Sequence, residues 1–86
     1  MNAFLAALDT IPEGYGEGLY DGRRWGVTYK IAADRRQRWL WGEELGGTGR
    51  VSFNLYLLAG GPALRPCEMS AEHVTAFVLG YVPIAD

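Results

Sequence analysis

The sequence has one cysteine, one histidine and no long apolar run, and each of these shortages excludes a class of protein. Cys67 lacks a second cysteine, which excludes an internal disulfide. A single Cys and a single His are too few ligands for a structural zinc site. No apolar stretch approaches the roughly 20 residues needed to cross a bilayer, and the N-terminal segment lacks the basic region of a signal peptide. We therefore expect a cytoplasmic protein with no membrane partner and no cofactor.

The sequence also lacks an excess of positive charge. Eight basic and ten acidic side chains give a formal net charge of -2, whereas a protein whose main task is to grip phosphates carries a basic surplus. Nucleic acid is therefore disfavoured as a partner. Core-forming residues, in contrast, are plentiful, since 49% of the 86 residues are hydrophobic and 13% are aromatic. This composition predicts one folded domain over residues 1–86 that needs no metal or disulfide.

Two segments have the apolar spacing of amphipathic helices. The first lies within residues 1–12 and is stopped by Pro12. The second lies within residues 69–81, where Ser70 is the expected N-cap and Gly80 the expected C′ residue. The apolar stripes are Phe4, Leu5 and Leu8 in the first helix and Val74, Phe77 and Val78 in the second.

Between these helices the sequence alternates as β-strands do. Asp21 and Gly22 supply the two positive-φ positions of a tight hairpin turn between the first two strands. In the second strand, Trp25, Val27, Tyr29 and Ile31 alternate with Arg24, Gly26, Thr28 and Lys30. Polar or glycine-rich turns lead into two further strands, 38–45 and 50–59. A short fifth strand follows around Pro66, which would confine it to an edge of the sheet.

The order of these elements predicts an α+β fold. We expect an antiparallel meander of four or five strands, with the short N-terminal helix and the C-terminal helix packed on one face. An antiparallel meander covered on one side leaves its other face open. That open face is where we expect the function to lie.

The stretch RRQRWLWGEEL, Arg35 to Leu45, holds three arginines, two tryptophans and two glutamates. Strand periodicity places Trp39 and Trp41 on one side and Arg38 and Leu40 on the other. If the tryptophans face the helices, they are core residues and Arg38 is a solvent residue. If Leu40 faces the core instead, the tryptophans form an exposed platform. We expect the core arrangement, because large aromatic side chains are usually mostly buried.

These alternatives lead to different functions. Aromatic and arginine side chains are enriched at interfaces, and the chain has no catalytic constellation, so we expect a non-enzymatic module that binds a protein partner or self-associates through the open face or an edge strand. An exposed platform would instead resemble the sheet surfaces that stack single-stranded bases. The candidate binding residues are Trp39, Trp41, Arg24, Lys30 and Arg38.

Cys67 is the one residue with strong nucleophilic or redox potential. A thiol-dependent enzyme centred on it would need a base, and His73 in the first turn of the expected C-terminal helix is the only histidine that can serve. The alternative is a small thiol at a strand end and a surface histidine, neither of which takes part in catalysis. We expect the second arrangement, because there is no resolving cysteine.

Four stretches of the sequence carry a family resemblance: EELGG (43–47), VSFNLYLL (51–58), LRPCEM (64–69) and FVLGY (77–81). Together they resemble a set of short proteobacterial proteins of uncharacterised function, some of which are labelled peptide methionine sulfoxide reductase. The resemblance covers most of the chain and implies a small, free-standing bacterial domain. The reductase motifs Gly-Cys-Phe-Trp and Arg-Tyr-Cys do not occur in this sequence. The resemblance therefore carries over no active-site residue, and Arg-Pro-Cys around Cys67 is the nearest counterpart.

Overall fold

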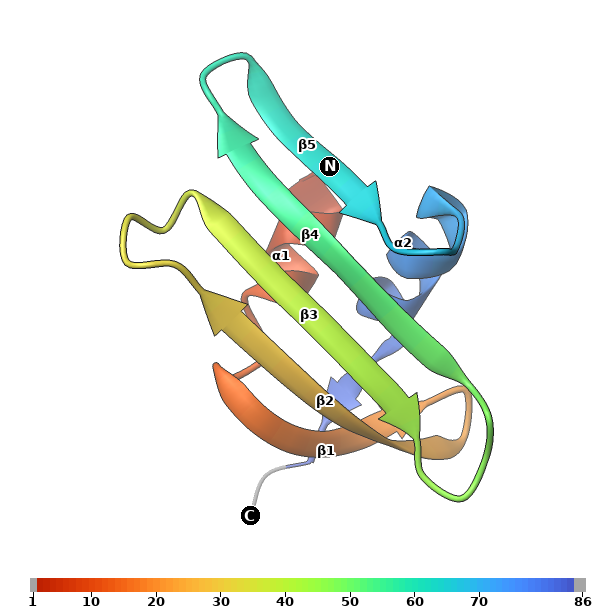
Figure 1. The fold of residues 1–86 in the computed structure, drawn as a ribbon. Coiled ribbons are helices and arrows are strands. Elements are labelled where there is room, and N and C mark those ends of the chain that lie inside the picture. The colour runs from red at the N-terminus through yellow and green to blue at the C-terminus, as the bar shows by residue number, and fades with distance from the viewer. Residues whose placement is uncertain (1, 85–86) are drawn as a thin grey trace.

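A computed structural model of the chain describes residues 2–84, which form a six-stranded antiparallel sheet with two helices on one face (Figure 1). In chain order the elements are α1 (Asn2–Leu8), β1 (Gly14–Tyr20), β2 (Arg23–Ile31), β3 (Gln37–Glu44), β4 (Arg50–Leu58), β5 (Gly61–Pro66), α2 (Ala71–Gly80) and β6 (Val82–Pro83). Across the sheet the strands lie in the order β5-β4-β3-β2-β1-β6. The first five strands are thus a meander, and the expected α+β architecture is confirmed.

The sheet has one strand more than the four or five that the sequence predicts. β6 pairs with β1 through Gly18–Pro83 and Leu19–Val82, and the Ile84 amide donates to the Glu17 carbonyl at 2.9 Å. A strand of two residues has no readable periodicity. It exists because α2 ends beside β1, whose outer edge has backbone groups to satisfy.

The turn between β1 and β2 follows directly from its two residues. Asp21 and Gly22 have φ values of 53° and 73°, as a two-residue hairpin turn with positive φ at both central positions requires. Tyr20 and Arg23 pair on either side of them. The predicted hairpin is confirmed.

α2 begins as predicted but ends differently. The Ser70 hydroxyl accepts from the His73 amide at 3.0 Å, which confirms Ser70 as the N-cap. The prediction that Gly80 is the C′ residue is wrong, since Gly80 is the last helical residue and Tyr81 is the cap. Gly80 serves packing instead, because a Cβ there would stand 3.0 Å from the Tyr20 ring.

The core lies between the sheet and the helices. Its buried residues come from both helices, from β2, β3 and β4, and from the segments beside α1 and α2: Phe4, Leu8, Ile11, Trp25, Val27, Tyr29, Leu40, Val51, Phe53, Leu55, Val74, Phe77, Val78 and Tyr81. Phe77 is the aromatic centre of this core, with its ring centroid 4.9 Å from that of Trp25 and 4.8 Å from that of Tyr20. The opposite face of the sheet, which we call the open face, carries neither helix (Figure 1).

Prolines line both edges of the sheet. In β5 the Cys67 amide just beyond the strand donates inward to the Ser52 carbonyl, so by alternation the backbone at positions 62, 64 and 66 points outward. Pro62 and Pro66 therefore remove two of the three outward N–H groups. The predicted edge position of the fifth strand is confirmed, and Pro83 stands in β6 at the other edge. Such edges are poor templates for strand addition.

Within residues 2–84, neither helix has the length and apolar content that crossing a membrane requires.

Candidate functional site

The orientation of β3 decides what the open face contains. Leu40 is 1% exposed in the core, whereas Trp41 is 43% exposed on the open face. Trp39 shares the face of Trp41, because residues two apart in a strand project to the same side. The expectation that both tryptophans lie in the core is wrong.

The neighbouring strands explain this orientation. Leu40 is in register with Tyr29 of β2 and Phe53 of β4, both of them core residues. A one-residue shift of β3 would move Leu40 out and the two indoles in. The core already holds the rings of Trp25, Phe77, Tyr20 and Tyr81 against α2. The smaller Leu40 therefore completes the core layer, and the tryptophans are left outside.

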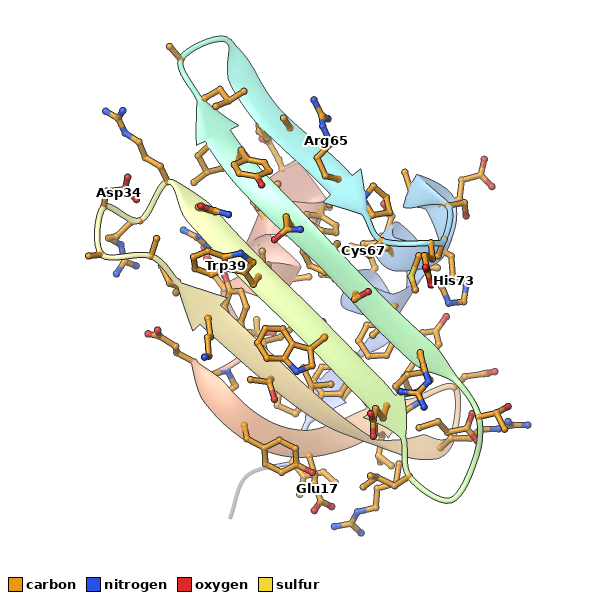
Figure 2. All side chains as sticks on the ribbon, viewed as in Figure 1. Glu17, Asp34, Trp39, Arg65, Cys67 and His73 are labelled. Carbon is orange, nitrogen blue, oxygen red and sulfur yellow. The ribbon has the colours of Figure 1, made fainter. Side chains whose placement is uncertain are left out.

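Aromatic rings dominate the middle of the open face, which Figure 2 views from the front. Tyr15 of β1 is 67% exposed and flanks Thr28 on one side, as Trp41 does on the other. A shallow hollow of about 290 Å³ lies between Lys30, Trp39 and Trp41. A second hollow of about 230 Å³ is lined by Tyr15, Gly26, Thr28, Trp41, Glu43 and Leu45. We call Tyr15, Trp39 and Trp41 the aromatic cluster.

Two of the predicted basic residues lie beside this cluster. The Lys30 ammonium is 5.7 Å from the centroid of the Trp41 ring, within the range of a cation–π contact. Arg24 donates from Nε to Glu17 at 2.8 Å, and both side chains are partly exposed. An exposed ion pair of this kind is worth roughly 0–1 kcal/mol. Both cations are thus held only loosely on the open face.

Arg38 does not belong to this surface, and its assignment as a binding residue is corrected. Its side chain is only 11% exposed and points to the helix side of β3. One guanidinium nitrogen lies 3.0 Å from an Asp9 carboxylate oxygen and 3.1 Å from the Tyr29 hydroxyl. Burial alone would lower the pKa of Arg38, but the hydrogen bonds to Tyr29 and Asp9, together with the charges of these two groups, outweigh it and hold that pKa above its usual value. Arg38 therefore ties β3 to the segment that follows α1.

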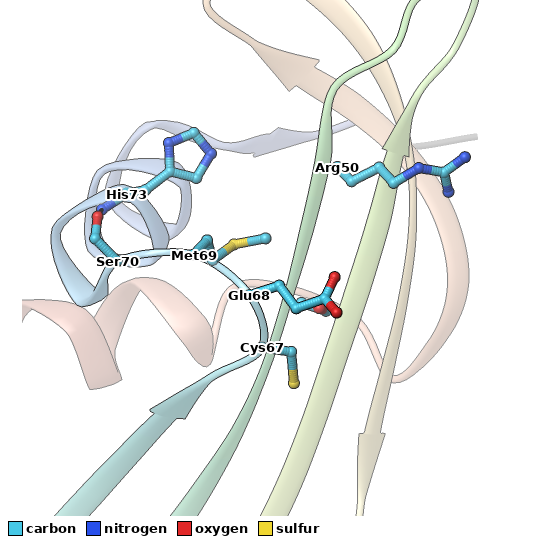
Figure 3. A pocket seen from close by; sticks show the side chains of 7 residues that line it. Arg50, Cys67, Glu68, Met69, Ser70 and His73 are labelled. Atoms are coloured by element: carbon cyan, nitrogen blue, oxygen red, sulfur yellow. Dashed lines mark hydrogen bonds between the residues drawn. The ribbon is translucent and has the colours of Figure 1, made fainter.

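Cys67 and His73 line one hollow of about 510 Å³ between β4 and the start of α2, together with Arg50, Ser52, Glu68, Met69 and Ser70. In Figure 3 the thiol and the imidazole point away from one another. The polar contact of the Cys67 sulfur is with the Asn54 amide nitrogen at 3.9 Å. The residues share a hollow without facing each other, and the thiol-enzyme hypothesis stays a prediction.

Tyr15 is a residue of the open face that was not predicted from the sequence. The signal was there, because Tyr15, Glu17 and Leu19 alternate with glycine and Tyr20 through β1. Gly26 on β2 is part of the same feature, since a Cβ at Gly26 would stand 2.5 Å from the Tyr15 hydroxyl. Tyr15 thus lies over the bare backbone of Gly26 and extends the aromatic cluster across three strands.

Comparison with protein-family models, curated proteins and solved structures yields no match to this chain. Among residues 2–84, no three His, Cys, Asp or Glu side chains are grouped so that they could hold a metal ion. The function is therefore inferred from the geometry of the open face.

Proposed function

We propose that the protein is a non-enzymatic binding module that recognises a partner protein through the open face of its sheet. The observation that carries this proposal is the outward orientation of Trp41 and Tyr15, which are 43% and 67% exposed on a face that neither helix covers. Tryptophan, tyrosine and arginine are the residue types enriched in the energetic centre of protein interfaces. Exposed aromatic rings grouped on one face are costly to leave in water unless a partner covers them.

The open face suits this role better than an edge strand. Strand addition needs a row of outward N–H and C=O groups. Pro62 and Pro66 interrupt that row on β5, and β6 has only two residues. Recognition through side chains of the open face has no such obstacle.

A substitution at the centre of the aromatic cluster tests the proposal. Trp41→Ala removes exposed ring area without opening the core, so the fold should persist while binding is lost. Leu79→Ala is the matched control, because Leu79 is also a large exposed apolar residue but lies on α2. Immobilised wild type and Leu79→Ala should retain the same proteins from a lysate of cells that also express the free chain, and Trp41→Ala should lose them. Equal retention by all three would count against the proposal.

Single-stranded nucleic acid is the second candidate partner, and the outward tryptophans favour it. Trp39 and Trp41 are two residues apart on one face, a spacing at which rings can stack successive bases, and Lys30 lies beside them. The chain's net charge of -2 and the nearby Glu43 oppose phosphate. Oligonucleotides should then quench tryptophan fluorescence at low salt, and the effect should weaken steeply as salt is added. Absence of quenching at low salt would remove this candidate.

We place this function in the bacterial cytoplasm. The exposed, unpaired thiol of Cys67 suits a reducing compartment, and the resemblance to short proteobacterial proteins supports a bacterial source. Fractionation of cells expressing the untagged chain tests the location, and recovery outside the cytoplasm would contradict it.

A further inference from the structure

Three rows of side chains cross the open face at right angles to the strands. The middle row follows the register Tyr15, Thr28, Trp41 and Ser52. On one side of it lies a row that we call the basic row, made of Lys30, Trp39, Asn54 and Arg65. On the other side lies a row that we call the acidic row, made of Glu17, Gly26, Glu43 and Arg50. Positive and negative charge thus flank an aromatic centre.

The two outer rows differ in how their charges are used. Within the described residues 2–84, neither Lys30 nor Arg65 forms an ion pair with a carboxylate. In the acidic row, Glu17 pairs with Arg24 at 2.8 Å and Glu43 pairs with Arg50 at 3.0 Å, and all four side chains are exposed. Exposed pairs of this kind are weak and exchange readily with other charges. Each carboxylate can therefore accept a second cation, and the basic row supplies unpaired ones.

This arrangement is complementary to itself. On β2, Lys30 and Gly26 lie at equal distances on either side of Thr28, about 7 Å along the strand. Consider a two-fold axis that lies above the open face, directly over the middle row and parallel to it. Rotation about this axis places a second molecule face to face with the first, so that the basic row of each molecule lies over the acidic row of the other. Lys30 of one copy then lies above Gly26 of the other copy, between Glu17 and Glu43 of that other copy. The Tyr15 hydroxyl, which lies over Gly26, can also accept a hydrogen bond from this Lys30. A two-fold axis repeats every such contact.

We propose that a second copy of this chain covers the open face, giving a symmetric dimer in which the two sheets pack face to face. The inference rests on the proposed function and names its partner. Packed sheets lie about 10 Å apart, a gap that Trp41, Trp39 and Tyr15 of both copies fill. The molecule measures 39 × 28 × 19 Å, so its broad side is comparable with the ~800 Å² that each partner contributes to a standard interface.

Charge exchange across the interface provides the test. Lys30→Glu places glutamate against Glu43 of the other copy, and Glu43→Lys places lysine against Lys30, so each homodimer carries two repulsive contacts. By sedimentation equilibrium each variant should dimerise at least about tenfold more weakly than wild type. An equimolar mixture of the two variants should restore dimers, because the glutamate introduced at position 30 of one variant then meets the lysine introduced at position 43 of the other. Only an interface between copies predicts this rescue.

Controls separate the surface from the fold. Glu72→Lys makes the same charge change as Glu43→Lys, but on α2 and away from the open face. This variant should dimerise as wild type does. Cys67 lies at the end of the middle row, beside Ser52, because the Cys67 amide donates a hydrogen bond to the Ser52 carbonyl. The two thiols of a dimer therefore lie near the same end of the axis. A short bis-maleimide should join them in wild type and leave Lys30→Glu monomeric.

The outcomes distinguish this inference from the function on which it rests. A wild-type chain that stays monomeric at all concentrations overturns the dimer, and if Trp41→Ala still abolishes retention of another protein, the proposed function stands. A dimer that both charge variants leave unweakened also overturns the inference, because its interface lies elsewhere. Loss of dimers in each variant, rescue in the mixture and cross-linking through Cys67 support it.

Discussion

Gly42 of β3 lies in close contact with two core side chains from the neighbouring strands. A Cβ at this position would stand 3.0 Å from a Val27 methyl carbon and 3.1 Å from a Val51 methyl carbon. Both valines are buried and β-branched, so their side chains have little freedom to turn aside. The absence of a side chain at Gly42 lets the neighbouring strands keep these two methyl groups in the core.

Gly42→Ala should therefore destabilise the protein. We expect the free energy of unfolding to fall by about 1–3 kcal/mol, as for other overpacked core positions. Gly16→Ala is the control, since a Cβ there would meet nothing within 4 Å. Urea denaturation of the two variants and wild type measures the difference. Equal stability of the two variants would show that the valines can move aside.

At the scale of the elements, Arg38 joins α1 to the sheet. It reaches from β3 to Asp9, directly after α1, and to the Tyr29 hydroxyl on β2. Its Nε is buried and has no hydrogen-bond partner among the described residues. The guanidinium thus contributes two hydrogen bonds and one unsatisfied donor, and the side chain as a whole is largely buried.

Replacing Arg38 separates packing from hydrogen bonding. Arg38→Ala should lower the free energy of unfolding by about 1–3 kcal/mol, because it removes both. Arg38→Met keeps most of the packing and eliminates the unsatisfied Nε, so its loss should be smaller. Thermal and urea unfolding measure both values. A methionine variant as unstable as the alanine variant would mean that the polar contacts, and not the packing, account for the effect.

For the molecule as a whole, two buried tyrosines connect stability to alkaline pH. Burial raises the pKa of Tyr29 above 10.0, although the hydrogen bond and charge of Arg38 act in the opposite direction. Burial also raises the pKa of Tyr81, with smaller contributions from Tyr15 and Glu17. In the unfolded chain both phenols ionise at their ordinary value. The folded state therefore keeps these protons to higher pH than the unfolded state does.

The sign of the pH dependence follows from these shifts. Below the unfolded value near 10.0 both states are protonated, and these tyrosines cause no change in stability. Above it the unfolded state loses its protons first, so the free energy of unfolding falls as pH rises. Urea denaturation over a pH series should show this decline, and Tyr29→Phe/Tyr81→Phe should reduce it. A decline of the same slope in the double variant would contradict the assignment.

Much of the fold could be predicted because its signals are local. The Asp21-Gly22 turn, the Ser70 cap and the edge position of the strand with Pro66 depend on the chemistry of one or two residues and their immediate neighbours. β6 and the helical end at Gly80 could not be predicted, since each depends on a strand or ring distant in sequence. The residues of the candidate surface also differ in how far they could be predicted. The open-face positions of Arg24 and Lys30 follow from the clear alternation of β2, whereas Arg38, expected as a solvent residue, is largely buried.

By itself, the sequence determined that there is a two-sided antiparallel sheet, that two amphipathic helices cover one side, and that β2 and β4 each have one apolar side. It could not determine the side on which Trp39 and Trp41 lie, because β3 has large apolar residues on both. Only the tertiary structure decided this. The register places Leu40 between Tyr29 and Phe53, so that these three side chains are buried together in the core. Because successive side chains of a strand project to opposite faces, Trp39 and Trp41 then lie on the open face.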